Sequence, residues 1–186
     1  MPKEYLSGNL LVAVPVLQDP NFDHTVTYLC LHNEEGAFGL VINRPLDGMV
    51  LGDLLSSLRL SAPEEVKSRS VYYGGPVQPE SGFVLHKPIG HWSSTLKVSG
   101  EIGVTTSKDI LEAIAAGEGP EKFLVMLGYA GWGAGQLERE IVGGAWLVAP
   151  ADEALLFDLP AEAKWRAAAD RLGVDLDLMI SPQGEA

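Results

Sequence analysis

Cysteine is nearly absent from this sequence. Cys30 is the only one among 186 residues, so the chain cannot form an internal disulfide. It lies in the apolar run 26–31, where a cysteine ordinarily behaves as a small buried hydrophobe. These features predict a reducing compartment, and we expect a cytoplasmic protein.

Long apolar runs are also missing. No segment approaches the about 20 apolar residues that a membrane-spanning helix needs. Glu4, Asn9 and Pro15 interrupt the apolar stretch near the N-terminus, so we expect no signal peptide. The sequence therefore predicts no membrane association.

Positive charge is scarce. The chain has 13 Lys and Arg against 25 Asp and Glu, which gives a formal net charge of −12, and the basic residues are scattered. Proteins that bind nucleic acids directly usually carry a basic stripe, and anionic membranes attract clustered basic residues. Direct binding to nucleic acid or to a membrane surface is therefore not expected.

What is present is the composition of a folded protein. Hydrophobic residues make up 46% of the chain and charged residues 20%, as in ordinary globular domains. No repeat, linker or change in composition divides the sequence. We therefore predict a single domain over residues 1–186.

The spacing of apolar residues predicts more strands than helices. Runs bounded by turn residues predict strands at 9–14, 25–32, 37–43, 70–73, 83–86, 95–98, 102–105, 123–127, 146–148 and 154–157. Amphipathic spacing predicts helices at 51–58, 107–116, 136–142 and 160–172. We expect a loop or short turn at 61–70, and a last strand or an extended tail at 176–180. Because the elements do not alternate, we predict an α+β fold with a mostly antiparallel sheet curled into a pseudo-barrel and helices packed outside.

The stretch 123–150 is the most informative. Its glycines, Gly128, Gly131, Gly133 and Gly135, predict a tight turn that uses positive φ angles. We expect Trp132 to be buried and to anchor that turn. The following helix, 136–142, would turn Leu137 and Ile141 inward and the charged residues 138–140 outward. This unit has a bend at which a ligand could bind.

Several ordered motifs resemble those of the YqgE/AlgH family of uncharacterised bacterial proteins. They are PVLQDPNF at 15–22, GAFGLVINRP at 36–45, GGPV at 74–77 with GFVLH at 82–86, GYAGWGAGQLERE at 128–140, WLV at 146–148 and KW at 164–165. The resemblance implies a bifurcated sheet rolled into a pseudo-barrel, and an association with the regulation of alginate production. It supplies no catalytic residues. This sequence has Leu31 before His32 where the family pattern has Glu, and Glu185 where the pattern has His.

Two glycine turns are candidate walls of one binding cleft. The cleft would comprise Asn43, Arg44, Gly74, Gly75, His86, Trp132, Gly133, Gly135, Gln136 and Glu138. Free N–H groups at the start of the 136–142 helix could hold an anion. However, the run lacks both the third glycine of a dinucleotide fingerprint and the lysine of a P-loop. Glu138 and Glu140 would also repel phosphate if they faced the bend, and a purely structural turn is the alternative.

The sequence indicates neither a metal site nor a catalytic set. The four histidines, at 24, 32, 86 and 91, have no Cys or Glu companion at ligand spacing. There is no G-x-S-x-G nucleophile motif, and nothing in the sequence activates Cys30. Glu138 or Glu140 could pair with Arg44, although an ordinary solvated helix face is the alternative. We predict no cofactor, no metal ion and no catalytic residue.

Two hypotheses of function remain. The first is a non-enzymatic cytoplasmic protein that acts through a protein partner, as a regulator or an interaction module. The second is a small-molecule or anion-binding protein, or an enzyme of undefined reaction, that uses the two glycine turns as pocket walls. A pocket shared by Asn43, Arg44, His86 and Trp132 would favour the second hypothesis.

Overall fold

The computed structural model describes residues 5–14 and 24–173. Ten strands form one sheet in the order β10-β1-β2-β3-β9-β6-β8-β7, with β5 paired to β9 and β4 paired to β5 off this path. The strands are β1 (Asn9–Ala13), β2 (Val26–Asn33), β3 (Gly36–Val41), β4 (Pro45–Val50), β5 (Ser70–Tyr73), β6 (Val77–Lys87), β7 (Thr95–Ser99), β8 (Ile102–Thr105), β9 (Lys122–Gly133) and β10 (Trp146–Pro150). The helices are α1 (Leu51–Ser57), α2 (Glu64–Lys67), α3 (Lys108–Ala115), α4 (Gln136–Val142), the π-helix η1 (Ala154–Asp158) and α5 (Ala161–Asp170).

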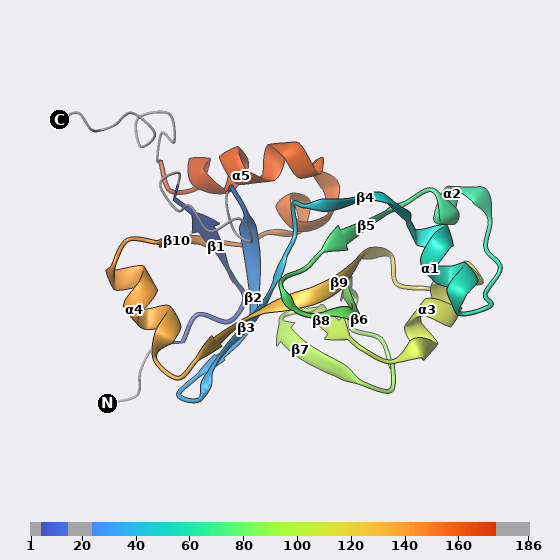
Figure 1. Cartoon of the computed structure of the whole chain (residues 1–186), viewed down its shortest axis with the longest axis horizontal. Coiled ribbons are helices and arrows are strands. Elements are labelled where there is room, and N and C mark those ends of the chain that lie inside the picture. The colour runs from blue at the N-terminus through green and yellow to red at the C-terminus, as the bar shows by residue number, and fades with distance from the viewer. Residues whose placement is uncertain (1–4, 15–23, 174–186) are drawn as a thin grey trace.

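The sheet divides along β9, the long strand that crosses the middle of the molecule (Figure 1). The last residues of β9 pair with β3, from Ala130 opposite Gly39 to Gly133 opposite Gly36. Its earlier residues pair antiparallel with β6 and parallel with β5. The predicted α+β fold, with a mostly antiparallel, curled and bifurcated sheet, is confirmed.

Three groups of buried side chains hold the two branches together. The largest fills the inside of the curl and is covered by η1 and α5, with Tyr28, Leu85 and Trp165 among its members. A second lies beneath α1 and α3, which sit at one end of the molecule, and a third lies beneath α4 at the opposite end (Figure 1). Each fully buried Leu or Val contributes about 1.5–3 kcal/mol relative to exposure. Among the described residues, no helix combines the length and apolarity needed to cross a membrane.

The predicted glycine turn at 128–135 is wrong over most of its length. β9 continues as a strand through Gly128 and Gly131 to Gly133, and only then does the chain turn, with Gly135 at φ 74°. The early glycines serve a close backbone crossing. A Cβ atom on Gly128 would lie 2.2 Å from the carbonyl oxygen of Gly75, and one on Gly75 would lie 2.1 Å from the carbonyl carbon of Tyr129.

Other differences have local causes. The strand predicted at 154–157 is instead η1, where the N–H of Leu159 donates to Ala154 O at 3.0 Å and Leu155 and Leu156 are both buried. β4 begins at Pro45, where the sequence predicted an end, because an edge strand tolerates a residue without an N–H. The segment 61–70 contains the short helix α2, and β6 runs on through Gly82. The motif at 15–22 and the predicted segment 176–180 lie outside the described residues.

Candidate functional site

The ten residues of the predicted cleft lie in several separate places. Gly74 and Gly75 belong to the backbone crossing with β9. The N–H of Gly74 donates to Leu127 O at 2.8 Å, and its carbonyl accepts the N–H of Val41 at 2.9 Å. Because neighbouring backbone fills the space where side chains would stand, these glycines form a junction between strands and not a pocket wall.

Asn43 and Arg44 hold the connection between β3 and β4. The Asn43 side chain accepts the N–H of Val26 at 2.9 Å and donates to His24 O at 3.0 Å. The Arg44 guanidinium carbon lies 6.0 Å from the centre of the Tyr73 ring. Both residues therefore contact other elements than those that carry Trp132.

His86 is fully buried on β6. Its Nδ1 lies 2.9 Å from Pro88 O and its Nε2 lies 2.7 Å from Thr105 Oγ1, which in turn lies 2.7 Å from Thr95 Oγ1. A carbonyl can only accept, so Nδ1 donates and Nε2 accepts, as in neutral imidazole. Burial lowers the pKa of His86, which agrees with this state. The chain of hydrogen bonds ties β6, β8 and β7 together.

Trp132, Gly133 and Gln136 do come together, around a residue that the predicted cleft omitted. One carboxylate oxygen of Glu140 accepts the indole N–H groups of Trp132 and Trp146, each at 2.9 Å. Its other oxygen accepts the Gln136 amide at 2.8 Å, and the Gln136 side-chain oxygen accepts Gly133 N–H at 2.9 Å. The prediction that Glu140 points outward is therefore wrong. Trp132 is 6% exposed, so its predicted burial is confirmed.

Glu138 contacts His32 on the same side of the sheet. His32 Nδ1 accepts the N–H of Leu6 at 3.1 Å, so its Nε2 carries the proton that faces Glu138 Oε2 at 3.1 Å. His32 is 4% exposed. These contacts join the N-terminal segment, β2 and α4, and together with the indole pair they read as structural bracing around the buried face of α4.

Two hollows that share Phe38 form the candidate site, and the sequence did not predict them. Phe38 stands on β3 opposite Leu31 on one side and Gly131 on the other. Its ring packs against Tyr129 and Phe83, with centroid distances of 5.2 and 5.9 Å. Because Gly131 has no side chain, it leaves space beside the Phe38 ring. We call these the Phe38 hollows.

The first Phe38 hollow, of about 320 Å³, is lined by Phe38 together with Ser94, Thr95, Leu96, Val104 and Thr106 of β7, β8 and their flanks. Leu96 and Val104 are directly opposite each other and face the same way. β7 is the last strand in the sheet order, and no strand in the described ranges pairs with its outer edge. The hollow therefore lies beside an open sheet edge.

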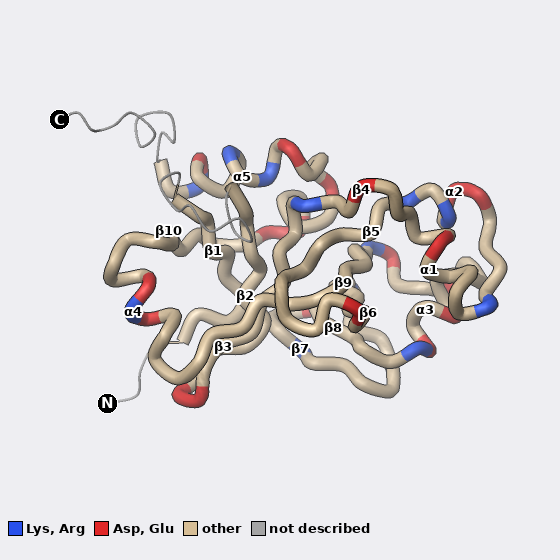
Figure 2. The backbone as a smooth tube through the Cα atoms, in the orientation of Figure 1, with Lys and Arg blue, Asp and Glu red and all other residues tan. Residues whose placement is uncertain are grey.

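The second Phe38 hollow, of about 210 Å³, extends toward the tip of the β2–β3 hairpin. Its lining comprises Leu31, Asn33, Glu35, Gly36, Ala37, Phe38 and Trp132. Leu31 is 42% exposed, which is unusual for so large an apolar residue in this protein. Glu35 is the one ionisable side chain in the lining of either hollow, and Glu34 precedes it; Figure 2 shows this acidic tip.

The hollows offer apolar surface, a free backbone edge and negative charge at one end. Their lining contains no set of acid, base and nucleophile. They suit the binding of another chain better than they suit a reaction.

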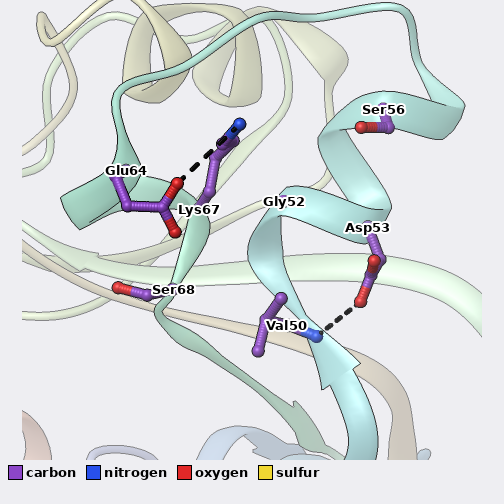
Figure 3. A pocket seen from close by; sticks show the side chains of 7 residues that line it. All are labelled: Val50, Gly52, Asp53, Ser56, Glu64, Lys67 and Ser68. Atoms are coloured by element: carbon purple, nitrogen blue, oxygen red, sulfur yellow. Dashed lines mark hydrogen bonds and ion pairs between the residues drawn. The ribbon is translucent and has the colours of Figure 1, made fainter.

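A further open pocket, of about 450 Å³, lies between α1 and α2 (Figure 3). Its polar groups largely serve one another. Asp53 Oδ2 accepts the N–H of Val50 at 2.9 Å and so caps α1, while Glu64 and Lys67 lie 4.0 Å apart. None of the predicted cleft residues lines it. Across residues 5–14 and 24–173, no group of three or more His, Cys, Asp or Glu side chains is placed to hold a metal ion.

Comparisons with known proteins agree on one family. A sequence model described as AlgH-like (DUF179) matches residues 10–177. The UPF0301 protein AlgH of Pseudomonas aeruginosa is 53% identical over 184 residues, which are 98% of this chain and 96% of that protein. A UPF0301 protein of Thioalkalivibrio sulfidiphilus is 53% identical over 180 residues, with 97% and 96% covered.

Solved structures show the same fold. The solution structure of P. aeruginosa AlgH matches with a TM-score of 0.81 at 51% identity, and the match covers 100% of both chains. A crystal structure of a Corynebacterium diphtheriae protein matches with a TM-score of 0.74 at 20% identity and covers 98% of this chain and 95% of that one. This second likeness concerns the fold alone.

Proposed function

This chain belongs to the AlgH-like family, and from that premise we propose that it is a non-enzymatic interaction protein that binds an extended segment of a partner along β7. The observation that carries the proposal is the open edge of β7 beside the first Phe38 hollow. An extended segment that joins a sheet edge gains main-chain hydrogen bonds, and neighbouring pockets select its side chains.

The free backbone groups of β7 can be identified from its pairing with β8. The N–H of Thr106 donates to Ser94 O at 3.0 Å, and Thr95 lies opposite Thr105. In an antiparallel pair, alternate residues point their N–H and C=O groups to the same partner. Leu96 therefore bonds to β8, whereas the backbone groups of Thr95 and Lys97 point outward, where a further strand would pair.

The hollows define the chemistry of the bound segment. Side chains of a strand alternate between two faces, so every second residue of the segment would face Phe38 and Leu96. These residues should be apolar. Glu34 and Glu35 at the hairpin tip, within a chain of net charge −12, favour basic residues at the other positions.

Lys97 also has a simpler interpretation. Exposed edge strands often carry a lysine that discourages unspecific pairing with other chains. Lys97 is exposed and stands in the middle of β7. Such a residue protects an edge without closing it, so the lysine is compatible with a specific partner whose sequence matches the hollow.

A regulatory role would follow from occupancy of the partner, without direct contact with nucleic acid. We place the protein in the cytoplasm, because its single cysteine is a buried thiol and the chain needs no disulfide. Fractionation of cells that produce the chain tests this location, and recovery in the periplasm would contradict it.

Selection from a library of random dodecapeptides tests the function. The full chain is immobilised, and selection is repeated on the variant Leu96→Glu and on Val142→Glu. Val142 is an apolar residue at the end of α4 that is 88% exposed, so its variant is the matched control. We expect peptides with alternating apolar residues and interspersed Lys or Arg, retained by the control and lost by Leu96→Glu. Peptides without this pattern, or retained equally by all three proteins, would contradict the proposal.

A further inference from the structure

A separate small cavity lies where β5 begins its parallel pairing with β9. It measures about 130 Å³ and is lined by Arg69, Ser70 and Tyr72 on one strand and by Phe123 and Phe157 across from them, with the backbone of 124–125 between. We propose that this cavity binds a small ring-bearing carboxylate, with the Arg69 guanidinium as its main ligand. The site is distinct from the Phe38 hollows, and either proposal can fail without the other.

Arg69 has no acidic partner in the described part of the chain. Its Nη2 donates to Phe123 O at 3.0 Å, and its guanidinium carbon lies 3.9 Å from the centre of the Phe123 ring. The residue stays open to solvent, yet the surrounding protein lowers its pKa through desolvation. Stacking and one carbonyl contact fix the plane of the guanidinium and leave most of its N–H groups for a ligand. A planar fork of this kind matches a carboxylate in a bidentate contact.

Tyr72 adds a second donor. Burial raises the pKa of its phenol, so the hydroxyl keeps its proton at neutral pH, and Arg69 and Glu162 are the charged residues that act on it. A protonated phenol can donate to a carboxylate oxygen. The Arg69 guanidinium and the Tyr72 hydroxyl therefore supply donors from two side chains of the same cavity lining.

The charges around the cavity are mostly positive. The amine of Lys164, buried at 1% exposure, lies 5.6 Å from the centre of the Tyr72 ring. Asp158, which follows Phe157, lies 2.9 Å from the Lys122 amine, and Glu153 lies 2.8 Å from the same amine. Glu162 remains as an exposed acid near Tyr72. Two cations against one solvated carboxylate favour an anion at this point of an otherwise acidic protein.

The walls set the size and shape of the ligand. A cavity of about 150 Å³ lined by apolar residues can hold benzene. The cavity at Arg69 is of similar volume, and the rings of Tyr72, Phe123 and Phe157 line it. A single planar ring with one carboxylate fits both the aromatic walls and the cationic fork, so a benzoate-sized acid is the ligand class.

Titration of the isotope-labelled full chain, followed by amide NMR, tests the site. The probes are benzoate, its neutral analogue benzamide and inorganic phosphate. We expect saturable shifts of the amides of 69–72 and 123–125 with benzoate, and at least tenfold weaker binding of benzamide. Equal binding of benzamide would overturn the role of Arg69. Equal shifts with phosphate would show unspecific attraction of anions and would also overturn the proposal.

Three variants separate the contacts from general charge. Arg69→Gln should weaken benzoate at least tenfold, and Tyr72→Phe, which removes one hydroxyl only, should weaken it several-fold. Arg59→Gln makes the same change of charge at an exposed arginine that does not line the cavity, and it should bind as the wild type does. Unchanged benzoate binding by both Arg69→Gln and Tyr72→Phe would overturn the proposal.

Discussion

Trp132 and Trp146 donate their indole N–H groups to the same carboxylate oxygen of Glu140, each at 2.9 Å. Their rings meet edge to face with centroids 6.0 Å apart. One residue of α4 thereby joins the end of β9 to the start of β10. Because both rings are nearly buried and the acceptor is charged, this junction should matter for stability more than an ordinary surface contact does.

Replacement of Glu140 tests that junction. Glu140→Ala leaves two indole N–H groups without this acceptor, and each buried donor left unpaired costs about 1–3 kcal/mol. We expect the free energy of unfolding in urea to fall by roughly 2–5 kcal/mol. Glu118→Ala, at an exposed loop position, is the control and should stay within about 0.5 kcal/mol of the wild type. Equal stabilities of the two variants would contradict the role of Glu140.

Removal of the Trp132 ring should be costly as well. Trp132→Ala deletes a nearly buried aromatic side chain, a change that typically costs about 3–5 kcal/mol. At roughly 2–4 °C per kcal/mol for a chain of this size, the melting temperature should fall by about 6–20 °C. A loss below about 1 kcal/mol would mean that the ring is not an anchor.

The crossing of Gly75 and Gly128 can be tested with two alanine variants. Gly75→Ala would force a Cβ into the backbone of Tyr129, at 2.1 Å from its carbonyl carbon. Gly48 also has a positive φ, of 78°, but nothing lies within 4 Å of an added Cβ. Gly48→Ala should therefore lose only about 1–2 kcal/mol for its backbone conformation. Gly75→Ala should lose more than about 4 kcal/mol or fail to fold. Similar losses at the two sites would contradict the close approach.

Lys164 predicts an unusual dependence of stability on pH. Its amine donates to Ile42 O and Leu156 O at 3.1 and 2.9 Å, and burial lowers its pKa from 10.5 to about 8. Between these two values the unfolded chain binds more protons than the folded one, so this residue's contribution to stability rises with pH. Below pH 8 the buried charge costs roughly 3 kcal/mol, and that cost disappears as the pH approaches 10.5.

The measurement is the unfolding free energy of the wild type minus that of Lys164→Met, at pH 7 and at pH 9.5. The difference between the proteins is used because burial also raises the pKa values of Tyr28 and Cys30, which lowers stability at high pH in both. We expect the wild type to gain on the variant by about 1–2 kcal/mol between these pH values. A constant or falling difference would contradict the assignment.

The sequence predicted those features that depend on neighbouring residues. The strand at 25–32 and the helix at 136–142 follow from local periodicity, and Trp132 was expected to be buried because it stands alone among small residues. The curled, divided sheet was predicted from the mixture of elements and from the resemblance to the family. In each case the decisive signal lies within a short stretch of the chain.

What the sequence could not show depends on contacts between distant segments. Gly75 and Gly128 require no side chain because they touch each other, so a glycine run read by itself suggested a turn. Glu140 has the same local pattern as a solvated helix residue, and only the positions of two tryptophans turn it inward. Phe38 resembles an ordinary strand residue until β7 ends the sheet beside it. The candidate site at the Phe38 hollows therefore appears only in the folded chain.

The most direct test of the proposed interaction is the dissociation constant of a library-selected peptide, measured by fluorescence anisotropy for the wild type, Lys97→Pro and Lys97→Ala. Lys97→Pro removes one outward N–H from β7 at a position where an edge strand tolerates proline, and Lys97→Ala removes the same charge but keeps the N–H. Circular dichroism of each variant checks that the fold is kept. We predict that Lys97→Pro raises the dissociation constant about tenfold or more, equivalent to about 1.4 kcal/mol, while Lys97→Ala binds as tightly as the wild type or more tightly. Equal dissociation constants for the proline and alanine variants would contradict binding along β7.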